Sequence, residues 1–188
     1  MPIFDHFDVL APLYDRLIKI PENHHLAQVS DLPIAGRLLD AAGGTGRIAQ
    51  QLVDQVGMMV ISDISVNMLR QAQQKDGLSC AVGSETEKMP FADGSFERVI
   101  VVDAYHHLLD QEQSLCEFWR VLAPGGRLVI EEPDIRRPGV KILALAEKLA
   151  FFRSHFVLAE KIAARLEEYG AKTNVKRDGI TVWIVGEK

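Results

Sequence analysis

The sequence predicts an α/β protein built on a doubly wound, mostly parallel seven-stranded sheet that ends in an antiparallel hairpin. Apolar runs alternate with helical patterns along most of the chain, and several runs are continuous in Val, Ile and Leu, as in parallel strands covered on both faces. The last two runs alternate instead, and Asp178-Gly179 joins them, which is a strong hairpin signal. The 188 residues, 47% hydrophobic and 25% charged, suit a single domain over residues 1–188.

The expected elements follow one another in a βαβ pattern. Strands are expected at residues 37–42, 58–64, 78–83, 98–102, 127–131, 172–177 and 180–185. Apolar residues recur at helical spacing between the first five strands: Ile48, Leu52 and Val56; Met68, Leu69 and Ala72; Leu115, Phe118 and Leu122. Pro124-Gly125-Gly126 is expected to end the last of these helices and to lead into the fifth strand.

The segment between the fifth strand and the hairpin has a helical pattern. One helix is expected from Pro138 to about residue 153, and a second from a break near Ser154 to Tyr169, with Gly170 as its C-cap. In a functional interpretation, the first helix forms a lid over an apolar small molecule or contacts lipid. In a structural one, it covers one face of the sheet. Covering the sheet is favoured, with these residues inward: Ile142, Leu145, Leu149 and Phe152.

Charge and cysteine content favour a cytoplasmic protein. A net charge of -5 argues against a nucleic-acid partner, because such binding needs a cationic field. No secretory leader is expected, and no apolar run reaches the ~20 residues of a membrane span, so no stable membrane insertion is expected. Cys80 and Cys116 have neither disulfide nor metal spacing and are expected to be buried, reduced thiols. The sequence carries no signal for an oligomeric state.

A glycine-rich turn links the first strand to the first helix. Residues 38–47 (LLDAAGGTGR) let the backbone approach a ligand, and the N–H groups that open the helix suit an anionic group. Asp63 ends the next strand, where its carboxylate would meet the ribose hydroxyls of a bound nucleoside. The alternative is that Asp63 only caps the helix that begins near Ser65, and the ligand interpretation is favoured. NAD fits poorly, since the third glycine of G-x-G-x-x-G is replaced by Arg47.

Five segments carry a shared pattern: residues 39–46 (LDAAGGTG), 83–91 (GSETEKMPF), 95–108 (SFERVIVVDAYHHL), 120–128 (RVLAPGGRL) and 7–15 (FDVLAPLYD). Taken together, they resemble the class I S-adenosylmethionine-dependent methyltransferases of the ubiquinone/menaquinone-biosynthesis-like branch (methyltransferase type 11). The resemblance implies a Rossmann-like fold, S-adenosyl-L-methionine as the cofactor and a small-molecule acceptor. It also implies that residues 1–30 form a helical cover and that residues 135–169 border the substrate pocket.

The resemblance assigns the cofactor site residue by residue. Asp63 matches the acidic residue that binds the ribose, and Glu85 matches the one that meets the adenine amino group. The expected cofactor-binding residues are Asp40, Ala42, Gly43, Gly44, Thr45, Gly46, Asp63, Ile64, Met68, Ser84, Glu85, Thr86 and Asp103. The chain departs from the family pattern at Ala42, where a glycine is usual, and in a short region before the last hairpin, which favours a general acceptor over a quinone precursor.

Candidate catalytic residues follow the fourth and fifth strands, where open α/β sheets place ligands. Asp103, Tyr105 and His106 are the candidates after strand four, with His106 chemically suited as a general base. Glu131, Glu132 and Asp134 belong to the same edge. The alternative, which is favoured for the histidines, is that His106 and His107 are part of the scaffold. No metal is expected, because adjacent histidines usually point in different directions and no H-x-x-x-H spacing occurs.

Methyl transfer to an unidentified small molecule is therefore the leading hypothesis. A cofactor-binding protein without transferase activity, a quinone-precursor C-methyltransferase and a nucleotide-dependent oxidoreductase remain as alternatives.

Overall fold

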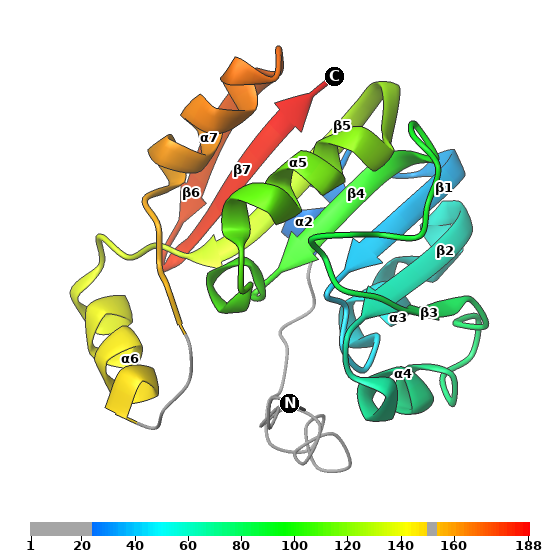
Figure 1. Ribbon diagram of the computed structural model, residues 1–188, viewed down its shortest axis with the longest axis horizontal. Helices are drawn as coiled ribbons and strands as arrows, with labels where there is room; N and C mark the ends of the chain where they lie inside the picture. The colour runs from blue at the N-terminus through cyan, green and yellow to red at the C-terminus, as the bar shows by residue number, and fades with distance from the viewer. Residues whose placement is uncertain (1–23, 150–153) are drawn as a thin grey trace.

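A computed structural model describes residues 24–149 and 154–188, and it confirms the α/β fold class (Figure 1). The sheet has seven strands in the order β3-β2-β1-β4-β5-β7-β6. Strands β1 to β5 run parallel, and β7 runs antiparallel to both β5 and β6. The strands are β1 (Ile34–Ala41), β2 (Val56–Asp63), β3 (Ala81–Gly83), β4 (Phe96–Val102), β5 (Leu122–Pro133), β6 (Lys172–Asp178) and β7 (Thr181–Glu187).

Helices cover both faces of the sheet, because successive strand residues point to opposite sides. Leu39 packs in the cluster under α5 and α7, whereas its neighbour Leu38 packs in the cluster under α2, α3 and α4. Both side chains are fully buried. The helices are α2 (His24–Val29), α3 (Arg47–Leu52), α4 (Val66–Ala72), α5 (Gln111–Val121), α6 (Pro138–Leu149) and α7 (Ala159–Glu168), with short 3-10 turns η1 (Val53–Gln55) and η2 (Tyr105–His107).

Helix α6 departs from the favoured expectation. Ile142 and Leu145 are 70% and 59% exposed, so these side chains do not cover the sheet. Figure 1 shows α6 (yellow) standing apart from the sheet that the other helices flank. Phe152 and the side chain of Leu149 lie outside the described residues. Helical periodicity shows which apolar residues recur along a helix, but it could not show whether another element would cover them.

Several boundaries also differ from the predicted ones. The hairpin turn consists of Gly179 and Ile180, because Asp178 still pairs with Thr181, so the turn lies one residue later than predicted. Gly179 takes a φ of 56°, which glycine adopts without strain. Strand β3 is shorter than predicted and β5 longer, and α5 ends at Val121, before Pro124. Gly170, with a φ of 91°, follows α7 as predicted.

Two further expectations meet the structure only in part. Cys116 is exposed on α5, so the expectation of a buried thiol is wrong there, and Cys80 is half-buried. Of the expected N-terminal cover, α2 and Ser30 are described, and Leu26 and Val29 of α2 are buried. Residues 1–23, including 7–15, lie outside the described residues. Within the described part of the chain, no helix is long and apolar enough to cross a bilayer.

Candidate functional site

The glycine turn lies where the strand order reverses. Strand β1 pairs with β2 on one side and with β4 on the other, so its carboxyl end opens at the switch point of the sheet, where α/β proteins bind ligands. Left-handed backbone recurs through the turn, with φ values of 55° at Ala42, 55° at Gly44 and 71° at Gly46. Alanine at the first of these positions is strained, because its Cβ crowds the following carbonyl.

Asp63 fastens this turn from the end of β2. Its Oδ2 accepts the N–H of Gly44 at 2.8 Å, and its Oδ1 accepts the N–H of Ser65 at 2.8 Å. Ser65 is itself the N-cap of α4, accepting the N–H of Met68. Ser65 and not Asp63 is thus the N-cap of α4, while Asp63 accepts the N–H of that N-cap residue and borders the turn with its half-buried carboxylate.

The floor of the turn is Asp40, whose side chain is almost completely buried at 1% exposure. A Cβ on Gly43 would lie 2.7 Å from the Asp40 carboxyl, so only glycine fits above it. Burial, followed by the charge of Asp63, raises the pKa of Asp40 to about 7. Its Oδ2 has no hydrogen-bond partner among the described residues. Among the described residues, apart from its chain neighbours, a Cβ on Gly44 would meet only Asp63 Oδ2 within 4 Å, so the described part of the chain leaves open space above that residue.

The remaining predicted cofactor residues divide into exposed and buried groups. Ile64 is 64% exposed beside Asp63, and Glu85 is also exposed. Thr45 and Met68 are buried at 1% and 2% exposure, behind the surface of the turn. Two others hold the β3 end in place: Ser84 Oγ lies 2.7 Å from Ser62 Oγ, and Thr86 Oγ1 lies 2.8 Å from Ser114 Oγ.

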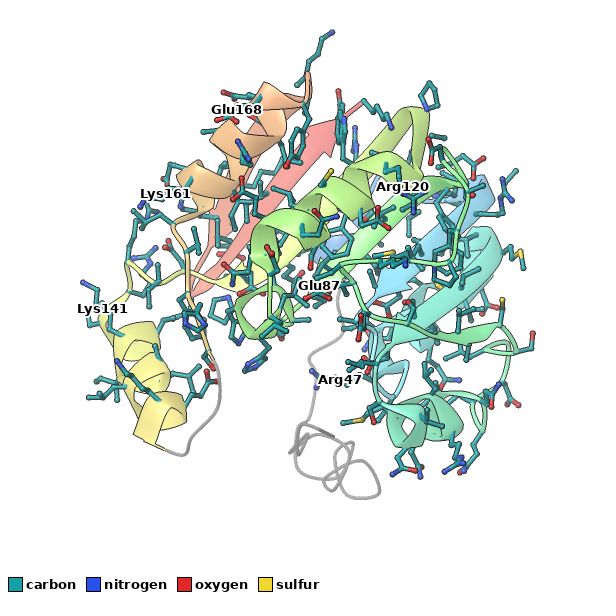
Figure 2. The ribbon with its side chains drawn as sticks, in the orientation of Figure 1. Arg47, Glu87, Arg120, Lys141, Lys161 and Glu168 are labelled. Atoms are coloured by element: carbon teal, nitrogen blue, oxygen red, sulfur yellow. The ribbon has the colours of Figure 1, made fainter. Side chains whose placement is uncertain are left out.

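Asp103 lies at the other side of the switch point, directly after β4. Its φ of 50° is unusual for a residue with a side chain, and its N–H donates to the carbonyl of Glu131 at 2.9 Å. Withdrawal from water raises the pKa of Asp103, and the charges of Arg47 and then His106 oppose the rise. The first residue of α3, Arg47, thus brings a guanidinium to the edge that Asp40 and Asp103 share (Figure 2).

His106 is buried and held by a carboxylate from β5. Its Nδ1 lies 2.5 Å from Oε2 of Glu132, and Oε1 of Glu132 accepts the N–H of Tyr105 at 2.9 Å. Although burial lowers the pKa of His106, the hydrogen bond and charge of Glu132 together raise it. Glu132 therefore fixes the orientation of the His106 ring and leaves Nε2 as the nitrogen that it does not engage.

Tyr105 turns away from the site. Its hydroxyl donates to the carbonyl of Gln111 at 3.1 Å, and the ring belongs to the core under α5. Burial, and next the charge of Glu132, raise the pKa of this phenol further above its ordinary value. Tyr105 therefore supports the loop after β4, and we do not carry it forward as a catalytic candidate.

A cavity of about 400 Å³ adjoins this edge between α6 and α7. Its apolar wall includes Phe156, whose ring stacks on His106 with centroids 4.2 Å apart. Lys141 and Lys161, both labelled in Figure 2, line it from the two helices. The described residues that line it are Ile135, Arg136, Lys141, Phe156, Val157, Leu158 and Lys161.

Sequence reasoning missed some residues of this edge. Arg47 was visible as the residue that ends the glycine motif, and its place at the start of α3 was the available signal. Phe156 lies in the irregular segment before α7, which has no periodicity to reveal it. Glu132 was named among the residues of the edge, but its pairing with His106 depends on the register of β4 and β5, which the sequence does not specify.

Comparison with known proteins finds a family model that matches the middle part of the chain. Residues 39–130 match the family model described as "Methyltransferase domain", and they span the glycine turn, Asp63, Glu85 and Asp103. This stretch, just under half of the chain, is therefore similar to a methyltransferase domain. The matched family and the Rossmann-like sheet imply S-adenosyl-L-methionine as the cofactor.

Two similar proteins are ubiquinone/menaquinone biosynthesis C-methyltransferases UbiE. The one from Syntrophotalea carbinolica is 36% identical over 139 residues, 67% of this chain and 59% of the relative. The one from Geotalea daltonii is 34% identical over 146 residues, 69% of this chain and 62% of the relative. The match thus spans about three fifths of each relative.

Solved methyltransferase structures share the fold. An S-adenosylmethionine-dependent methyltransferase from Thermotoga maritima superposes with a TM-score of 0.79 over 97% of this chain and 98% of that chain, at 22% identity. This identity is low, so the comparison concerns the fold alone.

Proposed function

We propose that this protein transfers a methyl group from S-adenosylmethionine to a small molecule with an apolar body and an anionic group. The observation that carries the proposal is the glycine turn closed on Asp63 at the switch point of the sheet. The space above Gly44 fits a ligand laid over the turn, since a side chain there would meet little of the protein that the structure describes.

Four residues around the turn have the chemistry to hold the cofactor. The Asp63 carboxylate accepts hydrogen bonds and suits the ribose hydroxyls, and Glu85 suits the adenine amino group. Ile64 offers exposed apolar surface beside Asp63 for the base. Arg47 supplies a cation for the carboxylate of the amino-acid part. When bound, the cofactor supplies an electrophilic methyl group on a sulfonium.

Alignment of acceptor and cofactor is the main contribution that we assign to the protein. Holding two reactants in line supplies up to ~7–11 kcal/mol in ideal intramolecular cases, so no catalytic triad is required. Asp103 is the proton acceptor that we propose, because it follows β4 at the switch point and withdrawal from water raises its pKa. His106 is paired with Glu132 and serves to shape the loop instead.

The cavity beside Phe156 is the proposed acceptor site. Its apolar wall suits a ring or short chain, and Lys141 and Lys161 suit an anionic substituent. Residues 135–169 would then border the acceptor, as the sequence predicts. A quinone precursor is the second candidate, and the similarity to the two UbiE proteins favours it.

Calorimetric titration with S-adenosylmethionine, S-adenosylhomocysteine and NAD, each alone, tests the cofactor first. Micromolar binding of the two sulfur compounds and none of NAD is expected. Methyl transfer is then measured on aromatic and short-chain acids, their uncharged analogues and quinone precursors. Lys161→Ala should raise KM for the acids about tenfold and leave uncharged acceptors unaffected. Cofactor binding without methyl transfer to any acceptor would favour the alternative of a cofactor-binding protein that lacks transferase activity. Absence of cofactor binding by folded protein would overturn the proposal.

A further inference from the structure

Two adjacent histidines and a distant glutamate converge beside the acceptor cavity. Potential ligand atoms of His106, His107 and Glu147 all lie within 4.8 Å of one another. The 3-10 turn η2 brings the two imidazole rings together, with centroids 4.0 Å apart and planes tilted by 45°. The expectation that adjacent histidines diverge therefore does not hold on this backbone.

His106 is oriented as a metal ligand usually is. Glu132 engages Nδ1 at 2.5 Å, which leaves Nε2 as the ligand atom, and Glu132 is itself fixed by the N–H of Tyr105. Metal-binding histidines commonly donate their other ring N–H to a carboxylate in this way, which fixes the tautomer and the ring orientation. Stacking on Phe156 holds the ring plane from the other side, at an interplanar angle of 16°.

Glu147 extends from α6 toward His106 and His107, and one of its carboxylate oxygens makes no hydrogen bond to a described residue. Its Oε2 is buried and has no hydrogen-bond partner among the described residues. A buried carboxylate oxygen without a partner is costly, and a cation would satisfy it. The ring of His107 is also held in position, because its Nδ1 lies 3.2 Å from Oγ of Ser154.

We propose that His106, His107 and Glu147 bind one divalent transition-metal ion, with zinc as the best fit. Two imidazoles and one carboxylate form a donor set found in zinc sites that keep a fourth position open. Zinc about 2.1 Å from each atom requires ligand separations of roughly 3.4 Å in a tetrahedron. Since the ligand atoms all lie within 4.8 Å of one another, no pair of them has to close by more than about 1.4 Å on binding. The bound ion would link α6, through Glu147, to the loop after β4, through His106 and His107, beside the cavity.

The site concerns metal alone and does not depend on the proposed methyl transfer. Full-length protein is stripped with a chelator, dialysed, and titrated calorimetrically with Zn²⁺ and, separately, with Mg²⁺. One equivalent of Zn²⁺ should bind with micromolar or tighter affinity, and Mg²⁺ should bind at least a hundredfold more weakly. Cobalt substitution should give the visible absorption of a four-coordinate ion.

Two variants and two controls assign the ligands. His107→Ala and Glu147→Gln should each weaken Zn²⁺ binding at least tenfold. The exposed residues His25 and Glu168 provide matched controls, so His25→Ala and Glu168→Gln should bind as the wild type does. Zn²⁺ should also slow proteolysis within α6 in the wild type and not in Glu147→Gln. Folded wild type that binds no Zn²⁺, or equal binding by all four variants, would overturn the site, and S-adenosylmethionine titration of the same samples reports separately on the cofactor.

Discussion

The backbone N–H of Gly44 donates to Oδ2 of Asp63 at 2.8 Å, which joins the carboxyl ends of β1 and β2. The same carboxylate accepts the N–H of Ser65 through its other oxygen. Asp63 therefore shapes the turn even without a ligand. A substitution that tests its role in cofactor binding must separate loss of charge from loss of these two acceptors.

Asp63→Asn and Asp63→Ala make that separation. Asn keeps one acceptor oxygen but loses the charge, so S-adenosylmethionine affinity should fall about 10- to 100-fold, as expected for a charge-assisted hydrogen bond of ~1.5–3 kcal/mol. Ala should lower affinity further and also lower the melting temperature, because two N–H groups lose their partner. Calorimetry and thermal unfolding measure both. Unchanged affinity in folded Asp63→Asn would remove Asp63 from the cofactor site.

Ala42→Gly should relieve strain in the turn. A left-handed conformation costs an L-residue ~1–2 kcal/mol, and glycine loses part of that gain through greater freedom in the unfolded chain. A rise of up to about 1 kcal/mol in the free energy of unfolding is expected, or about 2–4 °C in Tm, without loss of cofactor affinity. Ala41→Gly, at the fully buried neighbour in β1, is the matched control and should destabilise the protein. A clear drop in Tm for Ala42→Gly contradicts the strain argument.

Asp40 should make stability fall as pH rises. Its pKa increases from 3.8 to about 7 on folding, so between these values the folded chain holds a proton that the unfolded chain has released. The free energy of unfolding then decreases with pH over this window, by a total on the order of 4 kcal/mol. Asp40→Asn should flatten this slope in urea titrations at successive pH values. Asp54→Asn, which removes an exposed carboxylate, should not, and equal slopes for both variants would contradict the assignment.

Arg120 should hold the segment that carries Glu85. The guanidinium of Arg120, which Figure 2 labels, donates to both oxygens of Glu117, at 2.7 and 2.8 Å, and to the carbonyl of Phe91 at 2.8 Å. Arg120→Gln should cost about 1–3 kcal/mol, since Glu117 is largely buried and loses its counterion.

The urea midpoint measures this loss, and Arg70→Gln is the control. Arg70 is exposed on α4 and donates to Asn67 alone among the described contacts, so its loss should cost less than about 0.5 kcal/mol. Equal midpoints for the two variants would show that the Arg120 network contributes no more than a surface contact.

The fold was predictable because most of its strands coincide with contiguous apolar runs of the sequence. The glycine turn was predictable because its residues are adjacent in the chain. The exposed position of α6 was not predictable, because helical periodicity identifies an apolar face of a helix but not which element packs against that face. Pairings across the fold were also beyond the sequence. Glu132 meets His106 only through the β4–β5 register, and Glu147 stands 40 residues from His107, at a spacing that matches no metal motif.

The segment between Asp134 and His155, which contains α6, is hydrogen-bonded to the rest of the protein at both of its ends. The N–H of Asp134 donates to the carbonyl of Ile180 at 2.7 Å, and the N–H of His155 donates to the carbonyl of His106 at 2.7 Å. Loop-closure entropy grows only slowly with length, by about 0.6 kcal/mol for each doubling. Segments of other lengths could thus be exchanged between these two hydrogen bonds at small cost, so the residues that line the proposed acceptor site can vary while the glycine turn is left intact.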